Sequence, residues 1–258
     1  PRAGHTRRPC PTWRGSSRAE PARFTLGYAA REASTMRSAL ATLGFDDSRQ
    51  TAAGVLVVRD EQPEPRPRFR GRLMFPIADV SGHIVGFGGR MLGDGAPNAP
   101  KYLNSSDSNV FSKGKLLYGL NWAKQAIRKV DRLVIVEGYF DVIRLMLVGI
   151  TEVVAPMGTA LTSDQAALIA KYTKNVFLLY DSDPPGLKAT FKSGDELLAN
   201  GVAVRVVSLP DGEDPDTFVA KFGADGFERA AAESVDTFER KITNQGRSGG
   251  VAATRRQR

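Results

Sequence analysis

The sequence has almost none of the side chains that form disulfides or bind zinc. Its 258 residues include one cysteine, Cys10, and two histidines, His5 and His83. One cysteine excludes an internal disulfide, and three such side chains far apart in the sequence are a poor zinc-ligand set. We therefore expect a protein of a reducing compartment that binds no zinc.

Long apolar runs are also missing. The most apolar stretch, residues 133–150, is interrupted by Glu137, Asp141 and Arg144, so it is a poor membrane span. The chain begins with Pro1, and its first residues lack the apolar core of a secretory signal. These features predict a cytoplasmic protein that does not enter a membrane, and a fragment of a longer chain.

Charge is distributed unevenly around a formal net value of +8. Residues 63–130 contain 11 basic and 4 acidic side chains, whereas residues 131–242 contain 11 basic and 18 acidic ones. Basic surfaces suit phosphates, and clustered acids suit metal ions. The alternative is that two solvated surfaces of opposite sign simply attract each other.

The chain divides by composition into a structured middle and two tails. Residues 1–20 and 243–258 are rich in Arg, Gly and Ser without periodicity, and are predicted to be disordered. A helix is expected over residues 31–43, ending at Gly44, followed by a turn-rich stretch around Pro63, Pro65 and Pro67. Residues 72–77 and 83–87 alternate as the strands of a hairpin. Residues 119–129 again have a helical pattern.

From residue 131 onward, strand-like and helix-like segments alternate. The strands are expected at 132–137, 152–156, 176–181 and 202–209, and the helices at 140–148, 162–172, 185–199 and 215–222. Such alternation predicts a mostly parallel sheet with right-handed crossovers. Thr162 and Asp183 occupy the positions of helix N-caps.

Acidic side chains follow three of these strands. They are Glu137 and Asp141, then Asp181 and Asp183, then Asp211, Glu213, Asp214 and Asp216. The carboxyl ends of parallel strands are where ligand chemistry gathers in open α/β sheets. The placement predicts a metal-dependent phosphoryl-transfer site.

Two of the acids have a structural alternative. Asp183–Pro184 and Asp214–Pro215 both match an N-cap followed by proline in the first helical turn. Capping needs one oxygen per helix, however, and Glu137 is poorly explained as a cap. Like charges ~4 Å apart repel by about 4 kcal/mol at an effective dielectric near 20, which cations relieve. Carboxylates without imidazole or thiolate favour Mg²⁺ or Mn²⁺.

Specific motifs carry a family resemblance. Glu137–Gly138 and Asp181–Ser182–Asp183 resemble the paired acidic motifs of the Toprim fold. Further motifs resemble the catalytic core of bacterial DnaG-type DNA primases, between residues 23 and 227. They begin at Arg23, Phe75, Gly86, Pro100, Phe111, Leu117, Val136 and Leu209.

The resemblance implies an α/β fold: a mixed α+β basic subdomain over residues 21–130, then a Toprim domain over 131–213 with a mostly parallel sheet flanked by helices. A helical segment is expected over 214–242. It also implies a DNA-directed RNA polymerase that makes short RNA primers from NTPs on single-stranded DNA, at the replication fork. Glu137, Asp181 and Asp183 would be catalytic, and the same three with Asp141, Asp214 and Asp216 would hold the metal.

In the basic subdomain, Arg90, Lys101, Asn104 and Lys113 match family positions that face template and nucleotide. The alternative for the two lysines is an ordinary solvated surface position. Gly88–Gly89 would let backbone approach a ligand, or form a tight turn at a strand end. Tyr102 and Tyr118 are candidates to stack on bases, or to pack in the core or at its rim.

Departures from the family leave alternatives open. The resemblance includes neither the family's zinc-binding domain nor its helicase-binding domain, so we expect a fragment of such a protein. Pro185 stands where the family usually has a small residue. The alternatives are a non-catalytic nucleic-acid-binding remnant of a truncated primase and another Toprim enzyme such as a nuclease. A topoisomerase is disfavoured because the further domain with its nucleophilic tyrosine is missing.

Overall fold

The computed structural model describes residues 23–60, 62–93, 99–158, 160–210 and 212–237. Both tails predicted to be disordered, and Asp211 of the third acidic cluster, lie outside the described residues. Within them, no helix is both long enough and apolar enough to cross a membrane.

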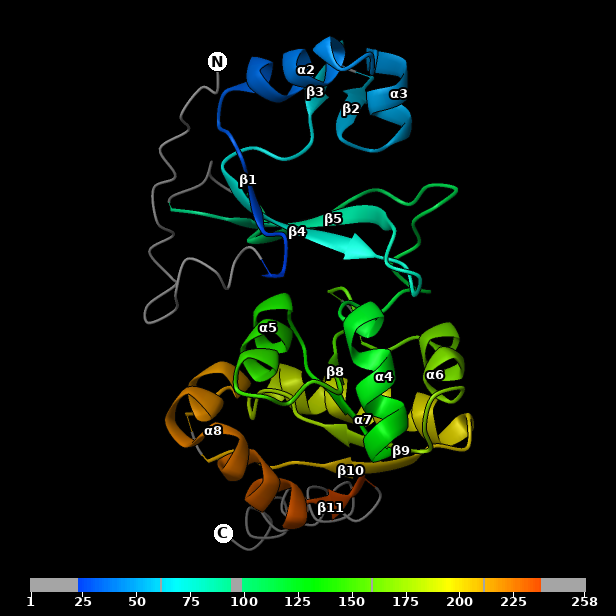
Figure 1. Cartoon of the computed structure of the whole chain (residues 1–258), viewed down its shortest axis with the longest axis vertical. Helices are drawn as coiled ribbons and strands as arrows, with labels where there is room; N and C mark the ends of the chain where they lie inside the picture. The colour runs from blue at the N-terminus through cyan, green and yellow to red at the C-terminus, as the bar shows by residue number, and fades with distance from the viewer. Residues whose placement is uncertain (1–22, 61, 94–98, 159, 211, 238–258) are drawn as a thin grey trace, which may run out of the picture.

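The first region contains an antiparallel sheet with a small helical and two-stranded unit beside it (Figure 1). The four-stranded sheet has the order β1-β4-β5-β6. Helices α2 and α3 and the two-stranded sheet β2-β3 lie at one end of the molecule. The elements are β1 (Gly27–Ala29), α2 (Ala33–Thr42), α3 (Asp47–Ala52), β2 (Leu56–Arg59), β3 (Gln62–Pro67), β4 (Arg72–Ala78), β5 (Ile84–Met91) and β6 (Tyr102–Asn104).

The expected hairpin is confirmed as β4 and β5, which pair antiparallel with Phe75 opposite Gly88. In its turn, the carboxylate of Asp79 accepts from the backbone N–H groups of Gly82 at 2.8 Å and His83 at 3.0 Å. Gly82 has a φ of 99°, a conformation that costs glycine little. The expected helix over residues 31–43 is likewise confirmed as α2.

The stretch predicted to be turn-rich is instead strand β3. Pro67 lies opposite Leu56 of β2 and Arg66 lies opposite Val57, and the N–H of Arg68, the residue after Pro67, donates to the carbonyl of Val55 at 2.9 Å. Prolines spaced by two place their missing donors on the same edge, away from the partner strand. Proline content alone was therefore a misleading signal here.

The second region is an α/β unit with a five-stranded sheet of order β11-β10-β9-β7-β8. Strands β10, β9, β7 and β8 are parallel, and β11 adds antiparallel to β10. The predicted alternation and mostly parallel sheet are confirmed. The elements are α4 (Leu120–Val130), β7 (Leu133–Ile135), α5 (Tyr139–Leu147), β8 (Val153–Val154), α6 (Ser163–Ile169), β9 (Asn175–Leu178), α7 (Pro184–Ala199), β10 (Ala203–Val206), α8 (Pro215–Ala232) and β11 (Val235–Asp236).

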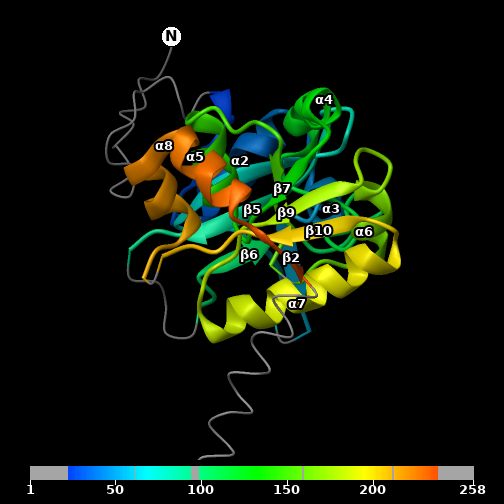
Figure 2. The ribbon, with the colours of Figure 1, turned by 90° about the horizontal axis from the view of Figure 1, so that it is seen from below.

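Helices cover both faces of this sheet, with α7 on one face and α4 and α5 on the other (Figure 2). Strand β7 is consequently fully buried, which explains its unbroken apolar sequence Leu133, Val134, Ile135. The N-cap predicted at Thr162 is confirmed, since its hydroxyl accepts from the N–H of Gln165 at 3.2 Å.

The two regions share one apolar core rather than meeting at a wet interface. The ring of Tyr139, at the start of α5, stacks on Phe75 of β4 with centroids 5.0 Å apart. A Cβ added at Gly88 would lie 2.6 Å from the Tyr139 ring. The tight turn expected at Gly88–Gly89 was wrong, because the pair lies inside β5 and the space at Gly88 is filled by the ring of Tyr139.

Candidate active site

Glu137 joins the ends of two neighbouring parallel strands. It follows β7 by two residues, and its Oε1 accepts from the backbone N–H of Asp181, beyond the end of β9, at 3.2 Å. Burial raises the pKa of Glu137, and the charges of Asp181 and Asp183 raise it further. The first two acidic clusters therefore lie together, as expected for acids at the carboxyl ends of neighbouring parallel strands.

Asp141 sits in the first turn of α5, where its Oδ2 accepts from the N–H of Gly138 at 3.0 Å. Burial raises the pKa of Asp141 to about 7, against the lowering effect of that hydrogen bond. The charges of Asp181, Asp214 and Asp216 add to the increase. Side chains separated by up to 75 residues in the sequence thus repel one another at a common location.

Asp183 and Asp214 are the N-caps of α7 and α8. Asp183 Oδ1 accepts from the N–H of Gly186 at 2.8 Å, and Asp214 Oδ1 from that of Thr217 at 2.7 Å. The capping interpretation is confirmed for both, and Pro185 is accommodated in the first turn of α7. A carboxylate has a second oxygen, so a cap can also contact a cation.

Asp181 completes the group. Burial is the largest cause of its raised pKa, and the charges of Asp214 and Asp183 raise the pKa further. Four of the six predicted acids, Glu137, Asp181, Asp183 and Asp214, therefore influence one another across three strand ends, and Asp141 responds to the same charges.

Asp216 differs from the others because it forms an ion pair with Nε of Arg144, on α5. Our sequence reading did not single out Arg144. It lies three residues after Asp141 on the same helix, a spacing that places two side chains on one face. That spacing was the available signal.

The chemistry of these groups supports metal binding, although their side chains are not arranged as a complete set of metal ligands. Among the described residues, no three or more His, Cys, Asp or Glu side chains are placed as a ready cage for an ion. The donors are carboxylates alone, which suits a hard divalent cation. Their mutually raised pKa values mean that a bound cation would relieve an existing repulsion.

Arg90 lies on β5 and contacts the first turn of α5. Its guanidinium lies 4.6 Å from the ring centroid of Phe140, the residue before Asp141, and 5.9 Å from that of Tyr102. Such contacts orient a cation without neutralising it. Over the described ranges Arg90 forms no ion pair, so its charge stays available to an anion.

Asn104 connects the two regions. Its Nδ2 donates to the carbonyl of Met157 at 3.1 Å, and its Oδ1 accepts from the hydroxyl of Tyr139 at 2.6 Å. The side chain therefore has a structural task beside the binding role implied by the resemblance. The Tyr139–Asn104 bond spans 35 residues, and no local pattern marks it.

Lys101 and Lys113 have exposed side chains. Lys113 lies in a loop fixed by its backbone: its N–H donates to Asp107 at 3.3 Å, and its carbonyl accepts from Gln165 at 3.0 Å. Of the tyrosines, Tyr118 is 1% exposed and belongs to the core, so it does not stack on bases. Tyr102 is 39% exposed and keeps that possibility.

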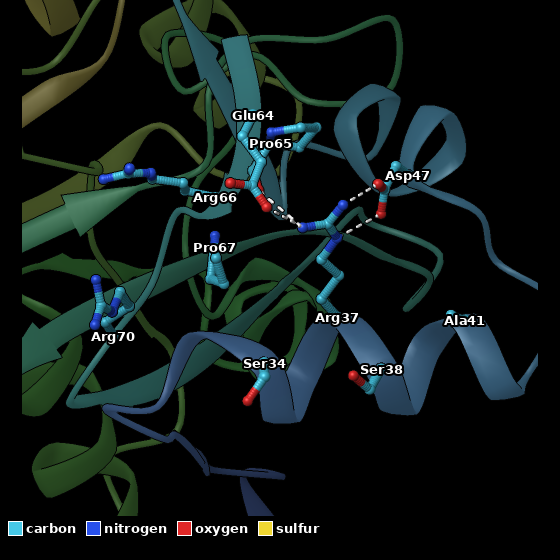
Figure 3. Close-up of a pocket in the computed structure, with 10 residues that line it drawn as sticks. All are labelled: Ser34, Arg37, Ser38, Ala41, Asp47, Glu64, Pro65, Arg66, Pro67 and Arg70. Carbon is cyan, nitrogen blue, oxygen red and sulfur yellow. Dashed lines mark hydrogen bonds and ion pairs between the residues drawn. The ribbon is translucent and has the colours of Figure 1, made fainter. Parts of the chain in front are cut away.

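One pocket contains none of the six candidate acids in its lining. It lies among α2, α3 and β3, where Arg37 points to Asp47 and Glu64 (Figure 3). Both carboxylates pair with the Arg37 guanidinium, which leaves its charge compensated. Arg66 and Arg70 also line this pocket, so the compensation concerns Arg37 and not the pocket as a whole.

Two sequence families match the chain in tandem. One is described as the DNA primase catalytic core, N-terminal domain, and covers residues 12–124; the other is described as Toprim-like and covers residues 134–219. The boundary between them falls between the antiparallel sheet and the mostly parallel sheet.

Similar proteins of known identity agree with these matches. The DNA primase of Halalkalibacterium halodurans is 42% identical over 216 residues, which cover 84% of this chain and 36% of that protein. The chain spans about a third of the length of the curated relatives it matches. The E. coli primase catalytic core superposes with a TM-score of 0.78 at 38% identity, covering 90% of this chain and 74% of that one. A DnaG primase catalytic domain bound to ssDNA gives a TM-score of 0.75 at 38% identity, covering 86% and 71%.

Proposed function

The chain belongs to the family of bacterial DnaG-type primase catalytic cores, and from this premise we propose that it synthesises short RNA primers from NTPs on single-stranded DNA. The reaction is a DNA-directed nucleotidyl transfer. Its place is the cytoplasm, at the replication fork. The replicative helicase is the partner expected for longer members of the family.

One observation carries the proposal: near a group of mutually repelling carboxylates lies an arginine that forms no ion pair with any described residue. Glu137, Asp141 and Asp181 have raised pKa values, and Arg90 stacks on the residue next to Asp141. The carboxylates favour bound cations, and the guanidinium of Arg90 favours an anion. A nucleoside triphosphate carried with divalent ions satisfies both.

Membership of a Toprim-like family implies dependence on divalent metal, and we assign Mg²⁺, or Mn²⁺, to the acids described above. Glu137, Asp141, Asp181 and Asp183 would hold the ions, with Asp214 and Asp216 at the edge. When bound, the ions supply charge neutralisation of the attacking and leaving oxygens.

The protein's own groups then have separate tasks. Glu137 organises the ends of β7 and β9 through the N–H of Asp181, and its raised pKa suits a base for the primer 3′-hydroxyl. Arg90 offers a planar fork to the triphosphate. The exposed Lys101 and Lys113 contribute charge along the template track.

Extension of a supplied primer tests this function directly. A DNA template with an annealed short RNA primer, NTPs and Mg²⁺ should give primers lengthened by NTP addition. Asp181→Asn should abolish extension and leave binding of single-stranded DNA intact. Asp164→Asn, an exposed acid in the first turn of α6, is the matched control and should extend normally.

The assay also separates the rival activities. A Toprim nuclease would shorten the template or primer in a metal-dependent way. A non-catalytic remnant would bind DNA and change neither strand. Absence of extension by the unmodified chain, with intact DNA binding and a folded protein, would refute the proposal.

A further inference from the structure

Strand β6 needs support beyond its own pairing. It has three residues, Tyr102–Asn104, and lies at the edge of the sheet, bonded to β5 alone. Lys101 precedes it and Asn104 ends it, so two proposed binding residues depend on its position. Short edge strands gain little stability from their own few hydrogen bonds.

Arg72 holds one end of this strand. Its side chain is buried, at 3% exposure, and it donates three hydrogen bonds to backbone carbonyls. Nη1 donates to Gly89 at 3.0 Å and to Lys101 at 3.3 Å, and Nη2 donates to Pro100 at 2.8 Å. The guanidinium thus joins β5 to the segment that enters β6.

Arg68 holds the other end. This half-buried side chain donates from Nε to the carbonyl of Asn104 at 2.8 Å. Burial lowers the pKa of both guanidinium groups, and neither has a carboxylate partner in the part of the chain that the structure describes. Burying a charge against neutral groups costs stability, so the arrangement is not explained by stability alone.

Gly89 makes room for this arrangement. A Cβ there would lie 3.1 Å from Cδ of Arg72 and 2.8 Å from the ring of Phe69. The two adjacent glycines of β5 therefore have different tasks: Gly88 admits Tyr139 from the second region, and Gly89 admits the arginine that reaches β6.

We propose that Arg68 and Arg72 are positioning residues that clamp β6 and thereby set the place of Lys101 and Asn104 in the template track. The binding part of this inference rests on the proposed function; the clamp itself does not. Both arginines act through backbone carbonyls and touch no substrate. Their role is distinct from that of exposed cations such as Arg66, which lies on β3 in the same Arg-rich stretch.

Replacement of arginine by lysine tests the clamp because it conserves charge. A lysine ammonium is a point donor and does not span the carbonyls of β5 and of residues 100–101 together. We would compare Arg72→Lys, Arg68→Lys and the control Arg66→Lys. Deuterium uptake would be followed for the amides of residues 101–105, well below the melting temperature of each variant.

The clamp predicts uptake at least about tenfold faster in Arg72→Lys, a smaller increase in Arg68→Lys, and none in Arg66→Lys, because hydrogen bonds from charged groups are the stronger class. Uptake in α5 should not change. Unchanged uptake at 101–105 in the two clamp variants would overturn the proposal. If Arg72→Lys does not fold, the comparison of Arg68→Lys with Arg66→Lys decides.

Binding of an oligothymidine single strand provides the second readout. The clamp variants should bind severalfold more weakly than the unmodified chain, with the same dependence of log Kd on log salt, because no charge is lost. Arg66→Lys should match the unmodified chain. Equal affinities for all four proteins would overturn the link from clamp to template. The uptake result is independent of primer extension, so a failed proposed function and a failed clamp remain distinguishable.

Discussion

The two sheets hold their functional charges in opposite ways. In and next to the antiparallel sheet, Arg68 and Arg72 donate to carbonyl oxygens and Arg90 stacks on aromatic rings. In the mostly parallel sheet, Glu137 and Asp183 accept from backbone N–H groups. In both, a neutral partner orients the charge and leaves its sign uncompensated.

Elsewhere in the molecule, charges are paired in the ordinary way. Arg37 meets Asp47 and Glu64, and Arg132 meets Glu152 and Glu228. Paired charges stabilise a fold modestly and attract little else. The comparison shows how the two kinds of charge differ. The charged side chains proposed to bind ligands contact neutral groups, whereas the others form ion pairs. Asp216, paired with Arg144, is the intermediate case.

The largest expected effect comes from removing a charge on the acidic side while keeping its hydrogen bond. Glu137→Gln retains an oxygen to accept from the N–H of Asp181, so the fold should persist. Extension of a supplied primer should fall by about 10²–10⁴, the range for loss of a general acid–base group. Rates would be measured at saturating NTP, with Glu233→Gln, on an exposed residue after α8, as control. Normal extension by the Glu137 variant would remove this residue from the mechanism.

Separating the two sheets should have the next largest effect. Gly88→Ala places a methyl group 2.6 Å from the ring of Tyr139, and overpacking of this kind costs about 1–3 kcal/mol. The free energy of unfolding would be measured by chemical denaturation. Gly27→Ala on β1, where the nearest atom to the new Cβ is 3.8 Å away, is the matched control. Equal stability of both variants would contradict the close approach.

A pH series sharpens the acidic half of the comparison. Because the pKa of Asp141 is raised to about 7, its ionisation disfavours the folded state. Without divalent metal, stability should therefore fall as pH rises from about 4, the ordinary pKa of an aspartate, toward 7, and level off above. Asp141→Asn should flatten this fall in melting temperature. Its amide oxygen can still accept from Gly138.

Metal addition should act with the opposite sign. Mg²⁺ should raise the melting temperature of the unmodified chain more at pH 8 than at pH 5.5, since it binds the ionised carboxylates of the folded state. The gain should be smaller in Asp141→Asn. An equal gain at both pH values would show that the acids do not act as the metal site.

The smallest expected effect is on the salt dependence of DNA binding, and it distinguishes basic side chains without an ion pair from paired ones in the first region. Lys101→Met should lower the slope of log Kd against log salt for single-stranded DNA by about 1, the value for one phosphate contact. Arg37→Met also removes one positive charge, but from the compensated pair beside Asp47, and should leave that slope unchanged. Identical slopes for the two variants would erase the distinction.

The sequence predicted much of this arrangement because the signals were local. Alternating segments gave the second sheet, and the Asp–Pro pairs marked the starts of α7 and α8. In the structure, β7, β9 and β10 are neighbours, which places the acids that follow them close together. What sequence reasoning missed joins distant residues: Asn104 to Tyr139, Arg144 to Asp216, and Arg72 to Pro100. Gly88 was misread for the same reason, since the ring that needs its space lies 51 residues later.

The contact of Gly88, Asn104 and Tyr139 bears on how such enzymes can be recombined. A chimera that takes its antiparallel sheet from one relative and its α/β unit from another would split this trio between parents. A larger residue at position 88 would then clash with the ring of Tyr139. A residue at position 104 that cannot accept a hydrogen bond would leave the Tyr139 hydroxyl without its partner. A crossover between these positions should therefore be best tolerated when both parents have the same residues at all three.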